Sequence, residues 1–193
     1  MFFEIDSKPR EREVVIDDQN NRYTYGDLCD FCAEFSTRVA PGSLVFILCN
    51  NCYASLAGYV ACLSCKVVAV MLSAEVDTKL LNGLIATYQP NVLLMSREQA
   101  KLFGDLSETW SFDDYVLLET DAQMHEIHPD IALLMTTSGS TGSPKLIKQS
   151  AQNILANAHS IIRYLEIDEN ERPITSLPMN YTYGLSILNS HLL

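Results

Sequence analysis

The chain has 193 residues, of which 48% are hydrophobic and 19% are charged. This composition supports a folded core and excludes an acidic disordered tail. The 13 Lys and Arg residues stand against 24 Asp and Glu residues, a net charge of −11, and the basic residues form no stripe. We therefore expect neither nucleic acid nor an anionic membrane surface as a partner.

Short apolar runs alternate with helix-length segments along the chain. We expect strands at residues 45–48, 67–71, 92–95, 116–118 and 131–135. We expect helices from a capping box at residues 24–27 to Pro41 and Gly42, at residues 53–63 and at residues 77–88. Strands spaced in this way predict βαβ units, and hence an α/β fold with a mostly parallel sheet flanked by helices.

The apolar stretch at residues 53–74 is interrupted only by Lys66. Its first half is rich in small residues and its second half is β-branched. A buried helix and strand joined by a turn at Lys66 are therefore favoured over a membrane span. Residues 1–6 show neither a basic segment nor a long apolar one, so we expect no signal peptide and a cytoplasmic protein.

The remaining segments predict two loops and two further helices. The polar, acidic residues 104–114 and 119–130 are predicted to be loops. Residues 184–193 predict a helix with no stop signal, which suggests that the natural chain continues. Ser150 is expected to cap a helix whose buried face is Ile154, Leu155, Ala158, Ile161, Ile162 and Leu165.

The six cysteines form three Cys-x-x-Cys pairs. A zinc site or a redox pair is an alternative for such spacing. Most of these cysteines lie inside apolar helical patterns, so we expect buried structural thiols and no metal site. The pairs are Cys29 with Cys32, Cys49 with Cys52, and Cys62 with Cys65.

Residues 134–145 read Leu-Met-Thr-Thr-Ser-Gly-Ser-Thr-Gly-Ser-Pro-Lys and carry the most chemistry in the chain. The two glycines allow a ligand to approach the backbone N–H groups, while the hydroxyl groups and Lys145 add donors and positive charge. The segment is suited to phosphate oxygens. It is not a Walker A loop, because two residues separate Gly139 from Gly142 and Leu146 follows Lys145. From the residues alone, a flexible surface loop remains the alternative.

The order of residues 134–145 resembles the phosphate-loop signature of the adenylate-forming superfamily, which includes acyl-CoA synthetases, luciferases and adenylation domains of peptide synthetases. The family commonly has glycine where Lys66 and Leu146 stand. Asn50 or Asn51 falls at its usual asparagine. Further segments similar to family motifs, in the same order, are residues 22–28, 42–51, 129–132 and 176–184.

The resemblance implies a reaction in two halves. A carboxylate attacks the α-phosphorus of ATP to give an acyl-adenylate and pyrophosphate, and a thiol then takes the acyl group. The implied cofactors are ATP, Mg²⁺ and coenzyme A, and the implied partners are a small carboxylic acid and the thiol of coenzyme A or of a carrier protein. Fatty acid metabolism is one expected setting.

The resemblance also implies roles for individual residues. Lys145 and Thr137 are the expected catalytic groups, and Tyr181 and Gly184 are expected at the acyl pocket. The expected phosphate-binding residues are Thr137, Ser138, Gly139, Ser140, Thr141, Gly142 and Lys145.

By this resemblance, residues 1–193 are the N-terminal portion of an AMP-binding domain, without the rest of that domain or its C-terminal lid domain. We expect this portion to be inactive alone and to self-associate through an exposed face of its last helix, made of Leu185, Ile187, Leu188 and Leu192. Two alternatives remain open: an adenylation domain that loads an amino or aryl acid onto a carrier protein, and a stand-alone, non-catalytic binding module.

Overall fold

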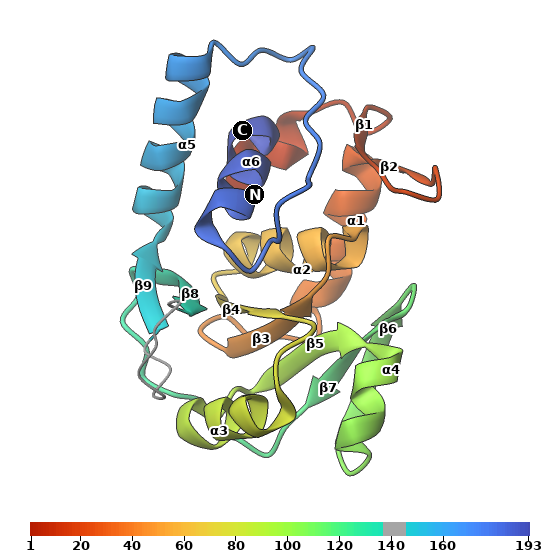
Figure 1. Ribbon diagram of the computed structural model, residues 1–193, viewed down its shortest axis with the longest axis vertical. Coiled ribbons are helices and arrows are strands. Elements are labelled where there is room, and N and C mark those ends of the chain that lie inside the picture. Colours follow the sequence, from red (N-terminus) through yellow and green to blue (C-terminus); the bar gives the residue numbers. More distant parts are fainter. Residues whose placement is uncertain (137–145) are drawn as a thin grey trace.

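The computed structural model describes residues 1–136 and 146–193, and Figure 1 shows the arrangement of the elements. The helices are η1 (Phe2–Ser7), α1 (Tyr25–Ser36), α2 (Tyr53–Ser64), α3 (Thr78–Tyr88), α4 (Arg97–Ala100), η2 (Lys101–Phe103), α5 (Ala151–Leu165) and α6 (Thr182–Leu192). The strands are β1 (Glu13–Ile16), β2 (Arg22–Thr24), β3 (Leu44–Cys49), β4 (Val68–Ser73), β5 (Val92–Ser96), β6 (Ser107–Phe112), β7 (Tyr115–Glu119), β8 (Ile131–Thr136) and β9 (Leu146–Ser150).

The main sheet of the described chain has the strand order β6-β7-β5-β3-β4-β8-β9. Its four central strands β5, β3, β4 and β8 run parallel, which confirms the predicted α/β fold. The strands at both edges pair antiparallel: β7 with β5, β6 with β7, and β9 with β8.

The prediction that residues 104–114 form a loop is wrong, because they contain the edge strand β6 at residues 107–112. The hairpin turns at Asp113, whose φ is 49°, so the turn uses a left-handed residue without a glycine to signal it. Trp110 and Phe112 on β6 pack edge-on against Phe31 of α1. This packing holds a strand that is too polar to be recognised from its own sequence.

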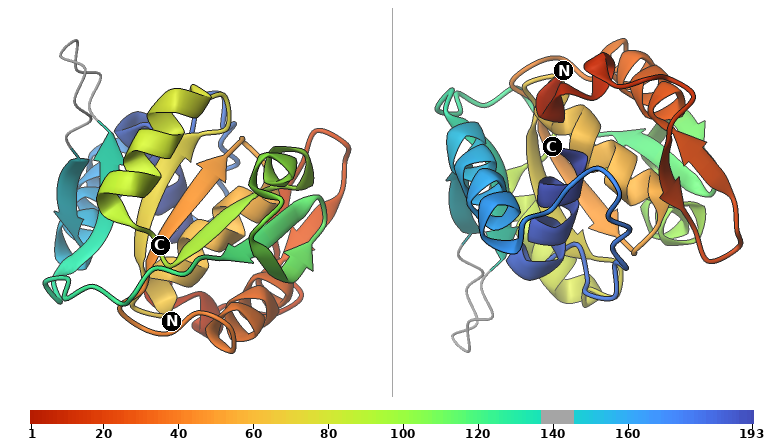
Figure 2. Two further views of the ribbon diagram at one scale, coloured as in Figure 1. Left: turned by 90° about the horizontal axis from the view of Figure 1, so that it is seen from below. Right: turned by 90° about the horizontal axis from the view of Figure 1, so that it is seen from above.

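Helices cover both faces of the sheet (Figure 2). Strand β3 is buried along its whole length, and its side chains alternate between two cores. Val45 and Ile47 join the core that contains α1, α2 and α6, whereas Leu44, Phe46 and Leu48 join the core beneath α3. The sheet therefore forms the middle of three layers.

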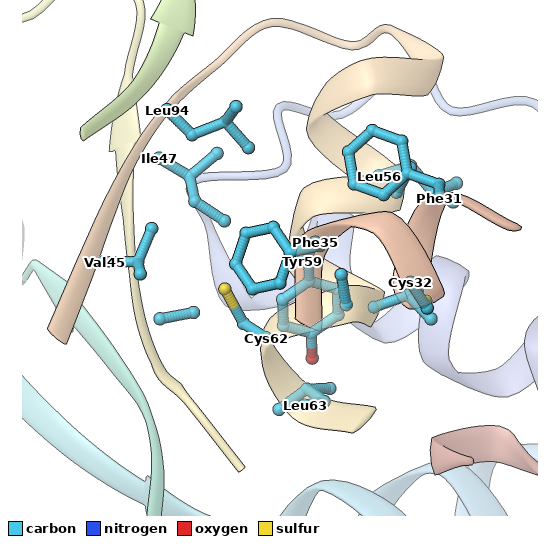
Figure 3. Close-up of a cluster of buried hydrophobic side chains, with 14 of the residues drawn as sticks. Phe31, Cys32, Phe35, Val45, Ile47, Leu56, Tyr59, Cys62, Leu63 and Leu94 are labelled. Carbon is cyan, nitrogen blue, oxygen red and sulfur yellow. The ribbon is translucent and has the colours of Figure 1, made fainter. Parts of the chain in front are cut away.

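The larger core is built on α1 and α2. Figure 3 shows Phe31 and Phe35 of α1 beside Tyr59 and Cys62 of α2, with Ile47 of the sheet on the other side. Phe35, Tyr59 and Cys62 have no exposed surface. These three residues fix α2 between the sheet and the outer helices.

Side-chain caps begin two of the helices, as predicted. Thr24 Oγ1 accepts a hydrogen bond from the Asp27 amide at 3.1 Å, and the Asp27 carboxylate accepts one from the Thr24 amide at 2.7 Å. Ser150 Oγ accepts from the Asn153 amide at 3.1 Å. Helix α1 ends at Ser36 rather than at Pro41, and a turn carries the chain onward.

The buried face of α5 is shorter than predicted. Ile154 and Ala158 are buried, whereas Leu165 is 61% exposed, because the last turn of α5 extends past α6 (Figure 1).

The prediction that α6 has an exposed apolar face is wrong. Leu185, Leu188 and Leu192 are buried in the larger core, so they offer no surface for self-association.

The turn between α2 and β4 explains the unusual lysine. Lys66 has a φ of 57°, in the left-handed region that glycine adopts without strain. Its carbonyl oxygen accepts a hydrogen bond of 2.8 Å from the amide of Gly42, which has a φ of 83°. Two left-handed residues thus tie the starts of β3 and β4 together.

The six cysteines are free thiols, and Cys29, Cys32, Cys49 and Cys62 are buried. Cys49 Sγ donates to the Leu72 carbonyl oxygen at 3.1 Å. Within residues 1–136 and 146–193, no three His, Cys, Asp or Glu side chains are placed to hold a metal ion. In the same part of the chain, every helix is too short or too polar to cross a bilayer.

The buried thiols predict a loss of stability at alkaline pH. Burial raises the pKa of Cys32 and of Cys49 from 9.0 to about 12. Between pH 9 and pH 12 the unfolded chain therefore loses thiol protons that the folded chain keeps, and stability falls as pH rises. We expect each thiol to lower the free energy of unfolding by up to about 1.4 kcal/mol per pH unit in that window.

Urea unfolding with a reductant, at several values from about pH 8 to about pH 11, measures this slope. The double variant Cys32→Ala/Cys49→Ala should give a shallower slope than the parent chain. Equal slopes would contradict the assignment to these two thiols.

Candidate functional site

The carboxyl ends of the central parallel strands meet at one edge of the sheet. β3 ends at Cys49, β4 at Ser73 and β8 at Thr136, and Met71 of β4 lies in register with Met135 of β8. In open α/β sheets, ligands bind in the crevice at this edge. We refer to it as the carboxyl edge.

The predicted phosphate loop is anchored at the carboxyl edge. It follows Thr136 directly and leads into β9 at Leu146, and Thr136 and Leu146 face each other in the β8–β9 ladder. The predicted site residues of the loop, Thr137, Ser138, Gly139, Ser140, Thr141, Gly142 and Lys145, lie outside the described residues. The structure therefore gives the position where the loop begins and ends.

Asn51 fastens a distant segment to the carboxyl edge. Its Nδ2 donates to the carbonyl oxygens of Thr175 at 2.6 Å and Leu177 at 3.0 Å, and its Oδ1 accepts from the Met179 amide at 3.1 Å. The side chain of Asn50 makes no comparable contact with the described residues. Asn51 is therefore the asparagine that shapes the site.

Two predicted pocket residues stand where that segment enters α6. Tyr181 is the N-cap residue of α6 and is 53% exposed. Gly184 is buried, and a Cβ atom there would lie 2.2 Å from the Pro178 carbonyl oxygen and 2.8 Å from that of Leu177. Only glycine lets α6 approach residues 177–178 so closely.

A cavity of about 400 Å³ lies between β8, β9, α5 and α6. Its described lining residues are Leu133, Met135, Ile147, Lys148, Gln149, Asn153, Ile154, Asn157, Thr182, Leu185, Ser186 and Asn189. Met135 and Ile147 are next to the two anchors of the phosphate loop. The lining thus extends from residues beside the carboxyl edge along α6, from Thr182 to Asn189.

The side chains facing the cavity are uncharged. Ile147 and Gln149 pair with Met135 and Leu133, which belong to the core on the α6 side of the sheet. Lys148 instead pairs with Leu134, which belongs to the core beneath α3. Because side chains alternate along a strand, the side chain of Lys148 leaves the sheet on the face opposite to those of Ile147 and Gln149.

Asn189 is a polar residue that the sequence analysis missed. It is 6% exposed, and its Oδ1 accepts a hydrogen bond of 3.0 Å from the hydroxyl of Tyr59. Burial raises the pKa of Tyr59, which keeps this hydroxyl a neutral donor. The available signal was a polar residue one turn after Leu185, on the apolar face of α6.

A second hollow, of about 460 Å³, lies at the opposite edge of the sheet between α1, β2 and β6. Its acidic groups are already engaged: Asp30 with Arg10 at 2.8 Å, Glu34 with Arg38 at 2.7 Å, and Asp27 in the helix cap. This hollow and the anchors Thr136 and Leu146 lie at opposite edges of the seven-stranded sheet.

The model of one family, described as AMP-binding enzyme, matches residues 2–193. The chain belongs to this family, as the resemblance of residues 134–145 predicted. Solved structures with the same α/β arrangement agree with this family at the level of the fold.

Two curated relatives carry the name 2-succinylbenzoate–CoA ligase. The protein of Oceanobacillus iheyensis is 24% identical over 193 residues, covering 95% of this chain and 40% of the relative. The protein of Bacillus pumilus is 28% identical over 183 residues, covering 88% of this chain and 37% of the relative. The chain therefore spans about two fifths of the length of these relatives. Neither name supports the expected setting in fatty acid metabolism.

Two solved structures show the same fold. MatB from Rhodopseudomonas palustris matches with a TM-score of 0.81 at 17% identity, over 99% of this chain and 42% of that one. O-succinylbenzoate coenzyme A synthetase from Bacillus subtilis, in complex with ATP and magnesium ion, matches with a TM-score of 0.77 at 21% identity, over 99% of this chain and 54% of that one.

Gly184→Ala tests the close approach of α6 to residues 177–178. The added Cβ would overlap backbone oxygen, so we expect a loss of about 1–3 kcal/mol in the free energy of unfolding. Gly83→Ala on α3 is the matched control, because a Cβ there meets nothing within 4 Å. It should stabilise the chain by about 0.5–1 kcal/mol. Chemical denaturation measures both, and a neutral Gly184→Ala would contradict the packing role.

Asn51→Ala tests the fastening of residues 175–181. The Met179 amide should lose its acceptor, and its hydrogen exchange should speed up by the equivalent of about 1–3 kcal/mol. Asn50→Ala is the neighbouring control and should leave this amide unchanged. Exchange measured by mass spectrometry or NMR decides the point, and unchanged protection of Met179 in Asn51→Ala would refute the role.

Proposed function

We propose that the chain is the N-terminal portion of the AMP-binding domain of an ATP-dependent acid–thiol ligase, most simply one that uses coenzyme A. The observation that carries the proposal is the position of the two residues that flank the predicted phosphate loop. These two anchors, Thr136 and Leu146, stand at the carboxyl edge, beside a cavity large enough for a small acid.

The reaction needs a good leaving group, because a free carboxylate is a poor acyl donor. Attack of the carboxylate oxygen on the α-phosphorus of ATP forms a mixed anhydride with AMP and breaks the bond to pyrophosphate. The protein then has to neutralise the charge that gathers on the pyrophosphate. In our proposal the hydroxyl groups of Thr137, Ser138, Ser140 and Thr141, the backbone at Gly139 and Gly142, and the cation of Lys145 do this.

The acid is proposed to lie in the cavity with its carboxylate toward the carboxyl edge. Tyr181 directly precedes Thr182 on the cavity wall, so its exposed ring is well placed to border the bound acid. Mg²⁺ would arrive with the ATP phosphates. The names of the curated relatives support coenzyme A as the acceptor, and we find no observation that favours a carrier protein.

ATP binding by the 193-residue chain, in the presence of Mg²⁺, tests the proposal. We expect binding that Lys145→Met weakens by about tenfold or more, since an ammonium–phosphate contact is lost. Lys101→Met, in η2 at the other end of the sheet, is the matched control and should bind ATP normally. Absence of ATP binding to the folded parent chain would refute the phosphate loop.

The same preparation tests the proposed extent of the domain. We expect no ATP–pyrophosphate exchange from these 193 residues, because the rest of the AMP-binding domain and the C-terminal lid domain are proposed to belong to other parts of the enzyme. Robust exchange would contradict this part of the proposal and leave the phosphate loop standing.

A further inference from the structure

We propose that Asn189 donates a hydrogen bond to the end of the acid that is remote from its carboxylate. The cavity would then select an acid whose tail carries an uncharged hydrogen-bonding group such as a hydroxyl or a ketone. This inference rests on the proposed function, since it concerns the acid that the enzyme would activate. It assigns a substrate class and a specificity-determining residue to the cavity.

The depth of the cavity places Asn189 at the tail of the acid. Helix α6 begins beside the segment that Asn51 fastens to the carboxyl edge, and Thr182 is its first residue. Asn189 follows seven residues later, about 10 Å further along the helix axis. An acid with its carboxylate at the carboxyl edge would therefore bring the end of an extended tail to Asn189.

The hydrogen bonds of Asn189 leave one group free for a ligand. Its Oδ1 is held by the Tyr59 hydroxyl at 3.0 Å, and Tyr59 is itself fully buried in the core shown in Figure 3. Among the described residues, nothing accepts a hydrogen bond from Asn189 Nδ2. Tyr59 thus fixes the amide so that a lone donor, on a side chain only 6% exposed, remains at the cavity wall.

The other lining residues limit which acid tails the cavity can bind favourably. The walls offer amide and hydroxyl groups at Gln149, Asn153 and Ser186 beside the apolar side chains of Ile154 and Leu185. A plain hydrocarbon tail would cover the Asn189 donor without satisfying it. A second carboxylate would lose its water without meeting a cation, because Lys148 lies on the other face of the sheet.

Three acids of equal chain length separate these possibilities: 8-hydroxyoctanoate, octanoate and octanedioate. Binding of each to the 193-residue chain can be measured by NMR titration or calorimetry. We expect 8-hydroxyoctanoate to bind about fivefold to tenfold more tightly than either of the others. Tighter binding of octanoate or of octanedioate, or no difference among the three, would overturn the proposed substrate class.

Asn189→Leu tests the residue itself. It should abolish the preference for the hydroxyl tail. The affinity for 8-hydroxyoctanoate should fall to that for octanoate, and the affinity for octanoate should stay the same or rise. If the single variant does not fold because Tyr59 loses its acceptor, the double variant Tyr59→Phe/Asn189→Leu replaces both partners with apolar groups of similar shape. A preference that survives in a folded variant would refute the role of Asn189.

Tyr59→Phe tests the positioning of the amide. It leaves Asn189 in place but frees its side chain to turn, so the preference should shrink by about threefold with octanoate affinity unchanged. ATP binding in the same samples separates the two proposals. ATP binding without the expected acid preference refutes the inference alone, whereas loss of ATP binding in the folded parent chain refutes the proposed function.

Discussion

Strand β3 is buried on both faces over its whole length, and the geometry of the site follows from this constraint. Each face of the sheet has to be covered by a helix, so the connections out of β3 and β4 are α2 and α3, on opposite faces. Helical crossovers make the central strands parallel. Their carboxyl ends then share one edge of the sheet. Residues far apart in sequence, such as Asn51 and Thr136, therefore lie at the same edge.

The site combines two kinds of environment. At the carboxyl edge, the two anchors of the phosphate loop, Thr136 and Leu146, are partly exposed. Behind that edge, the cavity is walled by apolar side chains with a few amide and hydroxyl groups, and Asn189 is held by a tyrosine in the core. A charged head and a neutral polar tail on one ligand would match this change of environment along α6.

Much of the fold could be predicted because its signals are local. The strands of the core are continuous apolar runs, and the cap residues Thr24 and Ser150 lie within three residues of the amides that they bind. Strand β6 could not be predicted, because its burial depends on Phe31 in α1. The burial of α6 was also misjudged, since η1 and α2 cover it from distant parts of the sequence. The segment at 134–145 resembles a family signature in its residue order, which is a local signal. Asn189 could not be singled out from the sequence, because its partner Tyr59 is 130 residues away.

The fastening by Asn51 has a consequence for how the protein folds. Its hydrogen bond to Thr175 joins residues 124 positions apart, and it can form only after β3 has taken its place in the sheet. Closing so long a loop is slow compared with forming the local helices. The segment at 175–181 should therefore dock late during folding, and it should detach from Asn51 at a lower free-energy cost than unfolding of the sheet.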